Sequence, residues 1–356
     1  MAIRSALLVG LSLSLAAACS STGSLQDSPG GAGGGGGGGT GGGQSGSGGG
    51  GTGGAAPPTM EISGLAYGNG TFVAVGSELQ NALLWTGVIY ASADGAAWTR
   101  VMGLSGEPHD VKFGNGKFVA IANAVSDSGV YPPKALVSDD GRTWTTSKDL
   151  PQQLVAQRIA FGAGMFVTAG MQSHLRSTDG MTWTAFGPEP ASYFSGTVDF
   201  AGGRFLSWTK WEKDVAVYDG NTWSSGAVSA TNYMLDDLRV VNDRFVGVTR
   251  YDCCFGEAPD QIRWGTVSSA DASTWTVDQT ALTVAPPQTV YESGTICIAF
   301  RGFDLLIGDT CRFLTVAFND NNFRPEALVY AGGVFVVSGM AGILSSSDGR
   351  VWTKRL

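Results

Sequence analysis

Residues 138–144 read Ser-Asp-Asp-Gly-Arg-Thr-Trp, and the pattern Ser-x-Asp-Gly-x-x-Trp in this stretch returns along most of the chain. The side-chain oxygens of Ser138 and Asp140 can accept hydrogen bonds from nearby backbone N–H groups, and Gly141 accepts a positive φ without steric penalty. Trp144 then lies on the outgoing strand, where its ring can pack against a neighbour. The stretch therefore predicts the tight turn of a β-hairpin and not an active site.

The turn pattern occurs in seven copies, which differ in how many of the Ser, Asp, Gly and Trp positions they keep. The complete copies place their carboxylates at Asp94, Asp140, Asp179 and Asp348. Two eroded copies keep Asp219 and Asp271, with Val217 in the Ser place of the first and Ala272 in the Gly place of the second. In the weakest copy, Asn319 and Phe323 hold the positions of the Asp and the Trp. We interpret the six Asp residues as structural parts of turns.

Each copy follows a second constant feature, which is a pair of short apolar strands around a turn. Residues 65–76 form such a pair around Asn69-Gly70, a strong hairpin signal, and residues 298–308 form one around Arg301-Gly302 in the sixth repeat. The second strand opens with an aromatic residue in most copies, at Phe72, Phe118, Phe166, Phe205, Phe245 and Phe335. One repeat is therefore predicted to be a sheet of four antiparallel strands.

Repeated sheets of this size, at periods of roughly 30 to 50 residues, are typical of a β-propeller. Radial packing covers both faces of each sheet, and closure of the ring removes the exposed end repeats. We predict an all-β fold, a seven-bladed β-propeller of four-stranded antiparallel blades, over residues 59–356. The blades are expected at 63–102, 109–147, 157–186, 196–225, 236–278, 294–324 and 326–356. Because the chain begins on a first strand and ends on a fourth, we expect closure without a swapped strand.

The first 58 residues predict export and a flexible tether. Residues 1–18 combine Arg4, an apolar run and small residues, as in a signal peptide, and the run is too short to span a bilayer. The sequence Leu-Ala-Ala-Ala-Cys at 15–19 resembles the lipobox of bacterial lipoproteins, which implies lipidation of Cys19; the alternative is an ordinary signal and an unmodified Cys19. Residues 19–58 form a Gly-rich linker that is expected to be disordered. Since Ser20 is not the Asp of an inner-membrane retention signal, we expect an outer-membrane lipoprotein of the bacterial cell envelope.

Composition and charge argue against several classes of protein. The net charge is −8, with 22 basic and 30 acidic residues, which disfavours nucleic acid as a partner. His109 and His174 do not stand at metal-ligand spacing from each other or from a Cys, and the sequence contains no nucleophile elbow or zinc motif. We expect no cofactor, no metal site and no catalytic residue, and we interpret both histidines as surface or packing residues.

Four cysteines remain once Cys19 is set aside: Cys253, Cys254, Cys297 and Cys311. An even number in an exported protein indicates disulfides. The repeat assignment places all four near one face of the ring, in or beside loops of repeats five and six. This favours a bridge between blades, from Cys253 or Cys254 to Cys297 or Cys311. A bond between the adjacent Cys253 and Cys254 is the competing possibility.

The loops opposite the turns are the expected place for a partner, because binding residues are often carried on loops of a rigid scaffold. The long ones are 77–88, 123–134 and 250–265. Together with repeat four they carry the aromatic and charged candidates Trp85, Tyr131, Trp211, Arg250, Tyr251, Glu257, Asp260, Arg263 and Trp264. Such a cluster suits a protein or glycan ligand. The alternative is that these rings only pack the loops down.

The repeated turn resembles the Asp-box, or BNR repeat, of sialidases and related propellers, in a form one residue shorter than the usual Ser-x-Asp-x-Gly-x-Thr-Trp. This resemblance covers residues 63–356 and implies the fold, with the boxes lying away from the ligand site. The sialidase Arg-Ile-Pro segment has only Phe323-Arg324-Pro325 as a counterpart here. We therefore expect a non-catalytic exported lipoprotein that binds a protein or glycan. The alternatives are a carbohydrate-active hydrolase and an assembly factor, since the photosystem-assembly propellers use similar repeats.

Overall fold

A computed structural model describes much of the chain from residue 60 to residue 356. The residues within this range that it does not describe are 82–83, 105, 127–128, 151–157, 171–172, 187–196, 211, 229–232, 252–262 and 283–284. The expected signal peptide, Cys19 and the linker lie outside the described residues. No helix among the described residues is long and apolar enough to cross a membrane.

The described residues form seven sheets of four antiparallel strands. Blade one contains β1 (Met60–Gly68), β2 (Thr71–Asn81), β3 (Leu84–Ser92) and β4 (Thr99–Leu104); blade two contains β5 (Gly106–Gly114), β6 (Lys117–Ser126), β7 (Gly129–Ser138) and β8 (Thr145–Asp149); blade three contains β9 (Ile159–Gly162), β10 (Met165–Gly170), β11 (Ser173–Ser177) and β12 (Thr184–Ala185). Blade four contains β13 (Thr197–Ala201), β14 (Arg204–Trp208), β15 (Asp214–Tyr218) and β16 (Trp223–Ala227); blade five contains β17 (Tyr233–Val241), β18 (Arg244–Tyr251), β19 (Arg263–Ser269) and β20 (Thr276–Leu282). Blade six contains β21 (Gln288–Glu292), β22 (Cys297–Arg301), β23 (Asp304–Gly308) and β24 (Thr315–Asn319); blade seven contains β25 (Pro325–Ala331), β26 (Val334–Gly339), β27 (Gly342–Ser346) and β28 (Thr353–Lys354).

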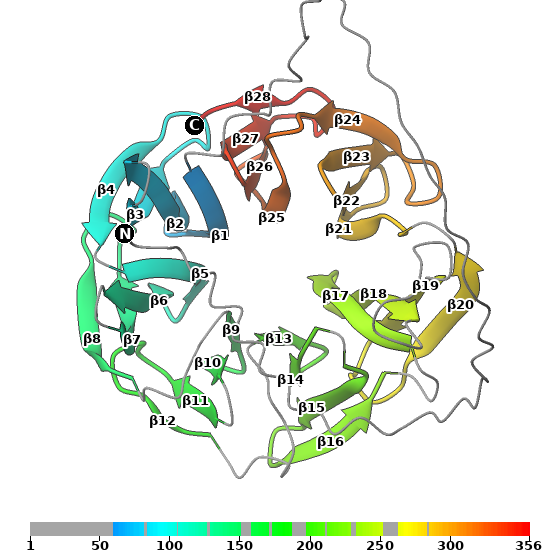
Figure 1. Ribbon diagram of the computed structural model, residues 1–356, viewed down its shortest axis with the longest axis horizontal. Coiled ribbons are helices and arrows are strands. Elements are labelled where there is room, and N and C mark those ends of the chain that lie inside the picture. The colour runs from blue at the N-terminus through cyan, green and yellow to red at the C-terminus, as the bar shows by residue number, and fades with distance from the viewer. Residues whose placement is uncertain are drawn as a thin grey trace, which may run out of the picture. The chain divides into compact units, whose positions relative to one another are not determined.

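The sheets are arranged as a ring, with the first strand of each blade nearest the centre and the fourth strand at the rim (Figure 1). This confirms the predicted seven-bladed propeller. Strand order within every sheet follows the chain, so no strand is swapped between the first and last blades. Blade seven contacts blade one through a hydrogen bond of 2.7 Å from the Ala341 N–H to the Met60 carbonyl.

The turns between third and fourth strands are held by their own side chains in every blade except blade six. In blade two, the Gly141 N–H donates to Ser138 Oγ at 2.8 Å, and the N–H groups of Arg142 and Thr143 donate to Asp140 Oδ1 at 2.7 Å. The indole of Trp144 donates to the Gly141 carbonyl at 3.1 Å. The turns with Asp94, Asp179, Asp271 and Asp348 repeat these bonds to carboxylate oxygens, and Asp219 accepts two N–H groups without a Ser partner.

These N–H bonds to the carboxylates lower the pKa values of Asp94, Asp140, Asp179 and Asp348 below their ordinary 3.8. A group whose pKa is lower in the folded state stabilises the fold above its unfolded pKa, and this contribution is lost as the pH falls through the folded value. We expect the denaturant midpoint of unfolding to change little between about pH 7 and 5 and to fall steeply below about pH 4. Chemical denaturation at a series of pH values measures this, and an Asp140→Asn variant should show a shallower acid dependence. A midpoint that stays constant down to about pH 2.5 would contradict the proposed role of the carboxylates.

The turns and the first hairpins lie on one face of the propeller, which we call the turn face; the loops between second and third strands lie on the opposite, loop face. The Asn69 amide in the first hairpin turn of blade one donates to the Asp139 carbonyl in the box turn of blade two, at 2.8 Å. Asn115 donates to the Thr178 carbonyl of blade three at 3.0 Å in the same way. Each Asn therefore connects its blade to the next one around the ring.

Aromatic rings also join successive blades beside these turns. Phe113 of blade two lies over Gly68 of blade one, and Phe161 of blade three lies over Gly114 of blade two. A Cβ on either Gly would overlap the ring above it. Glycine at this position is therefore required by the close approach of the next blade and not by a positive φ.

Blade six differs from the prediction in its strand assignment. In five blades the aromatic residue of the second strand pairs with the Ser of the box turn, in the pairs Phe72–Ser92, Phe118–Ser138, Phe166–Ser177, Phe245–Ser269 and Phe335–Ser346. In blade six the corresponding pair is Cys297 with Gly308. The box turn of this blade is thus 308–314, and the prediction that Asn319 and Phe323 hold its Asp and Trp positions is wrong.

The predicted first hairpin of blade six is also wrong. The hairpin turns at Gly294 and Thr295, between β21 and β22, and the Arg301-Gly302 turn joins the second strand to the third. The error has a physical origin, because Gly302 adopts a positive φ of 59° and mimics the hairpin signal, while the box turn has lost its Ser, Asp, Gly and Trp. The blade therefore begins at residue 288 instead of 294.

The disulfide of blade six also differs from the prediction. Cys297 and Cys311 are bonded to each other within blade six, with a Cα–Cα distance of 5.2 Å, so the predicted bridge between blades from Cys253 or Cys254 to either of them is wrong. Cys297 occupies the position of the second-strand Phe, and Cys311 occupies that of the box Gly. Both lie on the turn face and not in loops of the opposite face. Cys253 and Cys254 lie outside the described residues.

Candidate binding site in the central channel

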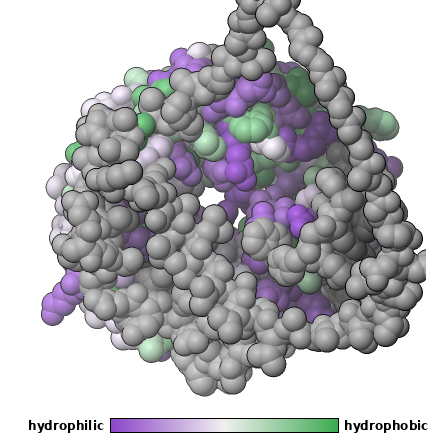
Figure 2. Space-filling model, in the orientation of Figure 1, coloured by the Kyte–Doolittle hydropathy of each residue, from purple (hydrophilic) through white to green (hydrophobic). Residues whose placement is uncertain are grey.

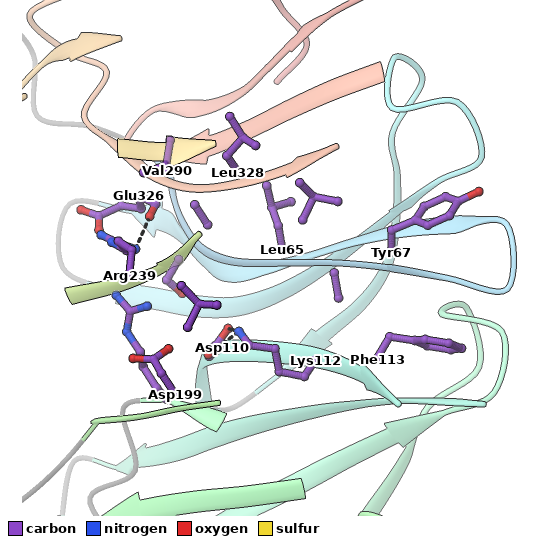
Figure 3. Close-up of a pocket in the computed structure, with 16 residues that line it drawn as sticks. Leu65, Tyr67, Asp110, Lys112, Phe113, Asp199, Arg239, Val290, Glu326 and Leu328 are labelled. Atoms are coloured by element: carbon purple, nitrogen blue, oxygen red, sulfur yellow. Dashed lines mark hydrogen bonds and ion pairs between the residues drawn. The ribbon is translucent and has the colours of Figure 1, made fainter. Parts of the chain in front are cut away.

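The first strands of the blades surround an opening at the centre of the ring, and hydrophilic residues border it (Figure 2). A cavity of about 360 Å³ lies there. Its charged lining residues are Asp110, Lys112, Arg158, Asp199, Arg239 and Glu326. Figure 3 shows Asp199, Arg239 and Glu326 gathered at one end of this cavity and Tyr67 and Phe113 at the other. The site therefore has a charged end and an aromatic end.

Two of the first strands carry the same charged pair. In β5, Asp110 accepts hydrogen bonds from the Lys112 ammonium at 2.8 and 2.9 Å. In β17, Asp237 accepts hydrogen bonds from the Arg239 guanidinium at 3.0 and 3.2 Å. The register shifts just before each Asp, and a β-bulge at this point redirects the side chains that follow. Alternation along the strand then places both members of each pair on the same face, and Asp110, Lys112 and Arg239 line the cavity.

Arg158 enters the same lining at the start of β9 but has no such pair. In the part of the chain that the structure describes, its guanidinium forms neither an ion pair nor a hydrogen bond. Burial alone would lower the pKa of this group, yet the carboxylates of Asp199, Asp110, Asp237 and Glu326 raise it above its ordinary value. Arg158 therefore stays cationic, and its N–H donors are available to a ligand.

The acidic groups near Arg158 are held by other partners. Asp199 Oδ2 accepts a hydrogen bond from the Trp208 indole at 3.0 Å. The Arg239 guanidinium donates to the Glu326 backbone carbonyl at 2.8 Å, and Arg324 lies 3.6 Å from the Glu326 carboxylate. Burial raises the pKa of Glu326, although the neighbouring arginines oppose this rise. Asp199 and Glu326 therefore each contact another group, and neither carboxylate forms a hydrogen bond with Arg158 among the described residues.

This arrangement suits recognition of a charged group that enters the channel. A planar guanidinium binds a carboxylate through two parallel hydrogen bonds, and such bonds are stronger in a partly desolvated site than in water. The surrounding carboxylates can accept hydrogen bonds from donors on the same ligand. No group of three or more His, Cys, Asp or Glu side chains in the described ranges is placed to hold a metal ion.

The residues predicted from the loops lie elsewhere. Arg250 and Tyr251 at the end of β18 pair with Trp264 and Arg263 at the start of β19, so the structure brings these four together on the loop face. Trp85 on β3 is half-buried and pairs with Leu79. Tyr131 lies on β7, where its side chain is not described, and Trp211, Glu257 and Asp260 lie outside the described residues. Those of the nine that the structure describes are not among the residues that line the channel cavity.

The channel residues were not predicted from the sequence, although it contains a usable signal. Asp110-Val111-Lys112 and Asp237-Leu238-Arg239 alternate charged and apolar residues in strands that were assigned only by their apolar positions. In a propeller the first strand faces the channel, so charges at alternate positions there indicate a channel site. Arg158 stands at the matching place in blade three, five residues before the turn at Ala163-Gly164.

Comparison with known proteins gives a likeness of fold. The structure resembles YCF48 bound to D1 peptide, with a TM-score of 0.58, 15% identity, and coverage of 81% of this chain and 93% of the other. It also resembles YCF48 from Cyanidioschyzon merolae, with a TM-score of 0.58, 12% identity and coverage of 82% and 96%. Virginiamycin B lyase from Staphylococcus aureus gives a TM-score of 0.57 at 8% identity, with coverage of 81% and 94%. Neither a protein-family model nor a curated protein sequence matches this chain.

All of these identities are low, so the likeness extends to the fold alone. The three structures are β-propellers. A protein-binding propeller and a lyase stand among them, which means that the shared architecture does not separate binding from catalysis. Any functional conclusion for this chain has to come from its own residues.

Proposed function

We propose that this chain is a non-catalytic, exported lipoprotein whose propeller binds a protein partner through the central channel. The observation that carries the proposal is Arg158, a cation without a partner among the described residues, in a cavity whose neighbouring carboxylates are already held by other groups. The nearby carboxylates keep Arg158 cationic without accepting hydrogen bonds from it, so its N–H donors suit a ligand that accepts charge-assisted hydrogen bonds. The YCF48 structure with its D1 peptide supports the idea that a ring of this kind can hold a peptide.

The ligand class that fits the channel is a peptide segment carrying a carboxylate, either from Asp or Glu or from a free C-terminus. Arg158 would bind the carboxylate, and the aromatic end of the cavity with Tyr67 and Phe113 would contact apolar side chains of the same segment. The loop-face strand ends around Arg250 and Trp264 would extend the contact to a larger partner. Catalysis of glycoside hydrolysis is the competing function, and the test below distinguishes it.

Lipidation of Cys19 would hold the propeller near the outer membrane. A flexible linker of the length of residues 19–58 has a root-mean-square span of roughly 35 Å, which would allow the ring to reorient at the surface. The resemblance of the turns to Asp-boxes is consistent with this arrangement. Asp-box turns lie away from the ligand site, so the channel and the loop face would remain open to a partner. The box turns would then be purely structural.

The decisive experiment is a peptide-binding assay with the full-length chain produced in a Gram-negative bacterium. Immobilised peptide libraries in which each sequence is present with a free and an amidated C-terminus and with Glu or Gln at internal positions provide the probe. We expect binding to carboxylate-bearing members and a loss of at least about tenfold in affinity with Arg158→Gln, since removing one partner of a charged hydrogen bond in a desolvated site costs at least about 1.4 kcal/mol. Arg142→Gln, at an exposed box turn, is the control and should bind as the wild type does.

Three results would overturn the proposal. One is equal binding by the wild type and Arg158→Gln; another is turnover of glycosidase substrates without peptide binding. The third concerns the anchor: membrane fractionation of the same preparation should place the wild type with the membranes and Cys19→Ser in the soluble fraction, and identical behaviour of the two would contradict lipidation.

A further inference from the structure

The junction between blades six and seven lacks two contacts that join blades one and two on the turn face. In blade one the Asn69 side chain hydrogen-bonds to blade two, and the matching turn residue of blade six is Gly294. The position of Gly68, over which the next blade stacks its ring, corresponds to Ser293. Neither the Asn bond nor the ring-on-glycine contact can form here. The two blades therefore meet less closely at their turns than blades one and two do.

A cavity of about 330 Å³ occupies this junction. Tyr330 of blade seven holds the position that Phe113 holds in blade two, but it stands beside Tyr291, with 5.5 Å between ring centroids, and 46% of its surface is exposed. Phe335 packs against Tyr330 at a centroid distance of 4.2 Å and an angle of 30°. Tyr330 is thus supported by Phe335 while much of its surface remains accessible to a ligand.

The rest of the lining is polar and carries both signs of charge. Hydroxyl groups come from Ser293, Thr295 and Ser347. Asp348 contributes a carboxylate that the N–H groups of its own turn keep ionised, and Arg350 contributes a guanidinium that pairs with Asp309 of blade six. The lining thus carries one carboxylate, Asp348, and one guanidinium, Arg350, so neither a cation nor an anion meets lining charges of the opposite sign alone. The pocket chemistry therefore favours a neutral ligand rich in hydroxyl groups.

The surroundings of the pocket have the character of a contact surface. Six large apolar side chains are exposed among the described residues, and two of them lie at the pocket: Tyr330 in its lining and Val351 beside Arg350. Val351, next to Arg350 in the box turn, is 71% exposed, whereas the matching position is Thr143 in blade two and Thr182 in blade three. Exposed apolar groups beside a pocket are typical of interaction sites.

We infer that the pocket between blades six and seven is a binding site for the ring of a neutral sugar. A pyranose has an apolar C–H face that can lie against the Tyr330 ring and a rim of hydroxyls that both donate and accept hydrogen bonds. Ser293, Asp348 and Arg350 offer acceptors and donors to that rim. The volume falls in the range of small-molecule pockets. This site is separate from the channel, because it lies on the turn face and shares no lining residue with the channel cavity.

The test is a glycan array probed with the full-length chain, followed by titration of the best neutral oligosaccharide. The array carries neutral, sialylated and amino-sugar glycans. We expect signals on neutral glycans, a loss of at least about tenfold in affinity with Tyr330→Ala through loss of the aromatic contact, and a smaller loss with Arg350→Ala. Arg142→Ala changes the matching position of box two and is the control, expected to bind as the wild type does.

The outcomes separate this inference from the proposed function. Arg158→Gln should leave sugar binding unchanged, and Tyr330→Ala should leave peptide binding unchanged. The inference is overturned if the wild type binds no neutral glycan, if it binds only charged ones, or if neither Tyr330→Ala nor Arg350→Ala weakens binding. Because Tyr330→Ala also removes a packing contact with Phe335, its unfolding midpoint is measured in parallel, and Arg350→Ala keeps the test valid if that variant does not fold.

Discussion

Loss of the Cys297–Cys311 disulfide is expected to lower the free energy of unfolding by about 3 kcal/mol, because the bond closes a loop of about 15 residues in the unfolded chain. The disulfide also takes part in packing in the folded state, which adds to this loss of free energy. In blade two, a Cβ on Gly141 would lie 3.4 Å from Phe118, so the second-strand Phe and the box Gly are in contact there. In blade six the disulfide takes the place of that contact. Denaturant unfolding of the wild type and of Cys311→Ser, each with and without reductant, measures the loss.

A rescue variant tests whether the two cysteines replace the usual pair. Cys297→Phe combined with Cys311→Gly rebuilds the Phe and Gly of the other blades, and we expect it to recover part of the stability that Cys311→Ser loses. The recovery is partial because Gly308 and Thr310 stand where the other boxes have Ser and Asp. If the double variant is no more stable than Cys311→Ser, the equivalence inferred from the strand register is wrong.

Gly162→Ala is expected to destabilise the ring by about 3 kcal/mol or more, through overpacking at the junction of blades three and four. An added Cβ would overlap the Phe200 ring at its first ring atom, which the side chain cannot move away without shifting its own backbone. Gly294→Ala is the matched control, since a Cβ added at Gly294 would have nothing within 4 Å and its φ is not positive. Its expected effect is within about 0.5 kcal/mol. Thermal and denaturant unfolding measure both.

A double variant identifies the cause. Phe200→Leu shortens the side chain above Gly162, so its combination with Gly162→Ala should be less destabilising than the sum of the two single changes. Additive losses would show that Gly162 is needed for another reason, such as its place at the end of β9.

Much of the fold could be predicted because the repeated turn is a local structure. Ser138, Asp140 and Gly141 make their hydrogen bonds within a few residues of one another, so their spacing alone predicts the hairpin. Blade six could not be assigned in this way. Its box has lost every side chain that makes the local bonds, and only the pairing of Cys297 with Gly308 across two strands reveals where the turn lies.

The channel site was harder to predict for a different reason. Asp110, Arg158, Asp199 and Glu326 are far apart in the sequence and belong to four different blades, and each looks like an ordinary polar position of a strand. The loop residues were predicted because aromatic and charged side chains stand out in a long loop. Four of them lie together because strands β18 and β19 pair with each other: Arg250, Tyr251, Arg263 and Trp264.

The amino-acid sequence by itself determined the repeating unit, the number of blades and the absence of a swapped strand, because each of these follows from hydrogen bonds and strand pairing between residues close in the chain. The two candidate binding sites were decided by closure of the ring. Arg158 lies near carboxylates of other blades because the first strands of all seven blades surround one axis. The pocket on the turn face is lined by residues of both blade six and blade seven. Both sites are made of contacts between blades, which no local pattern records.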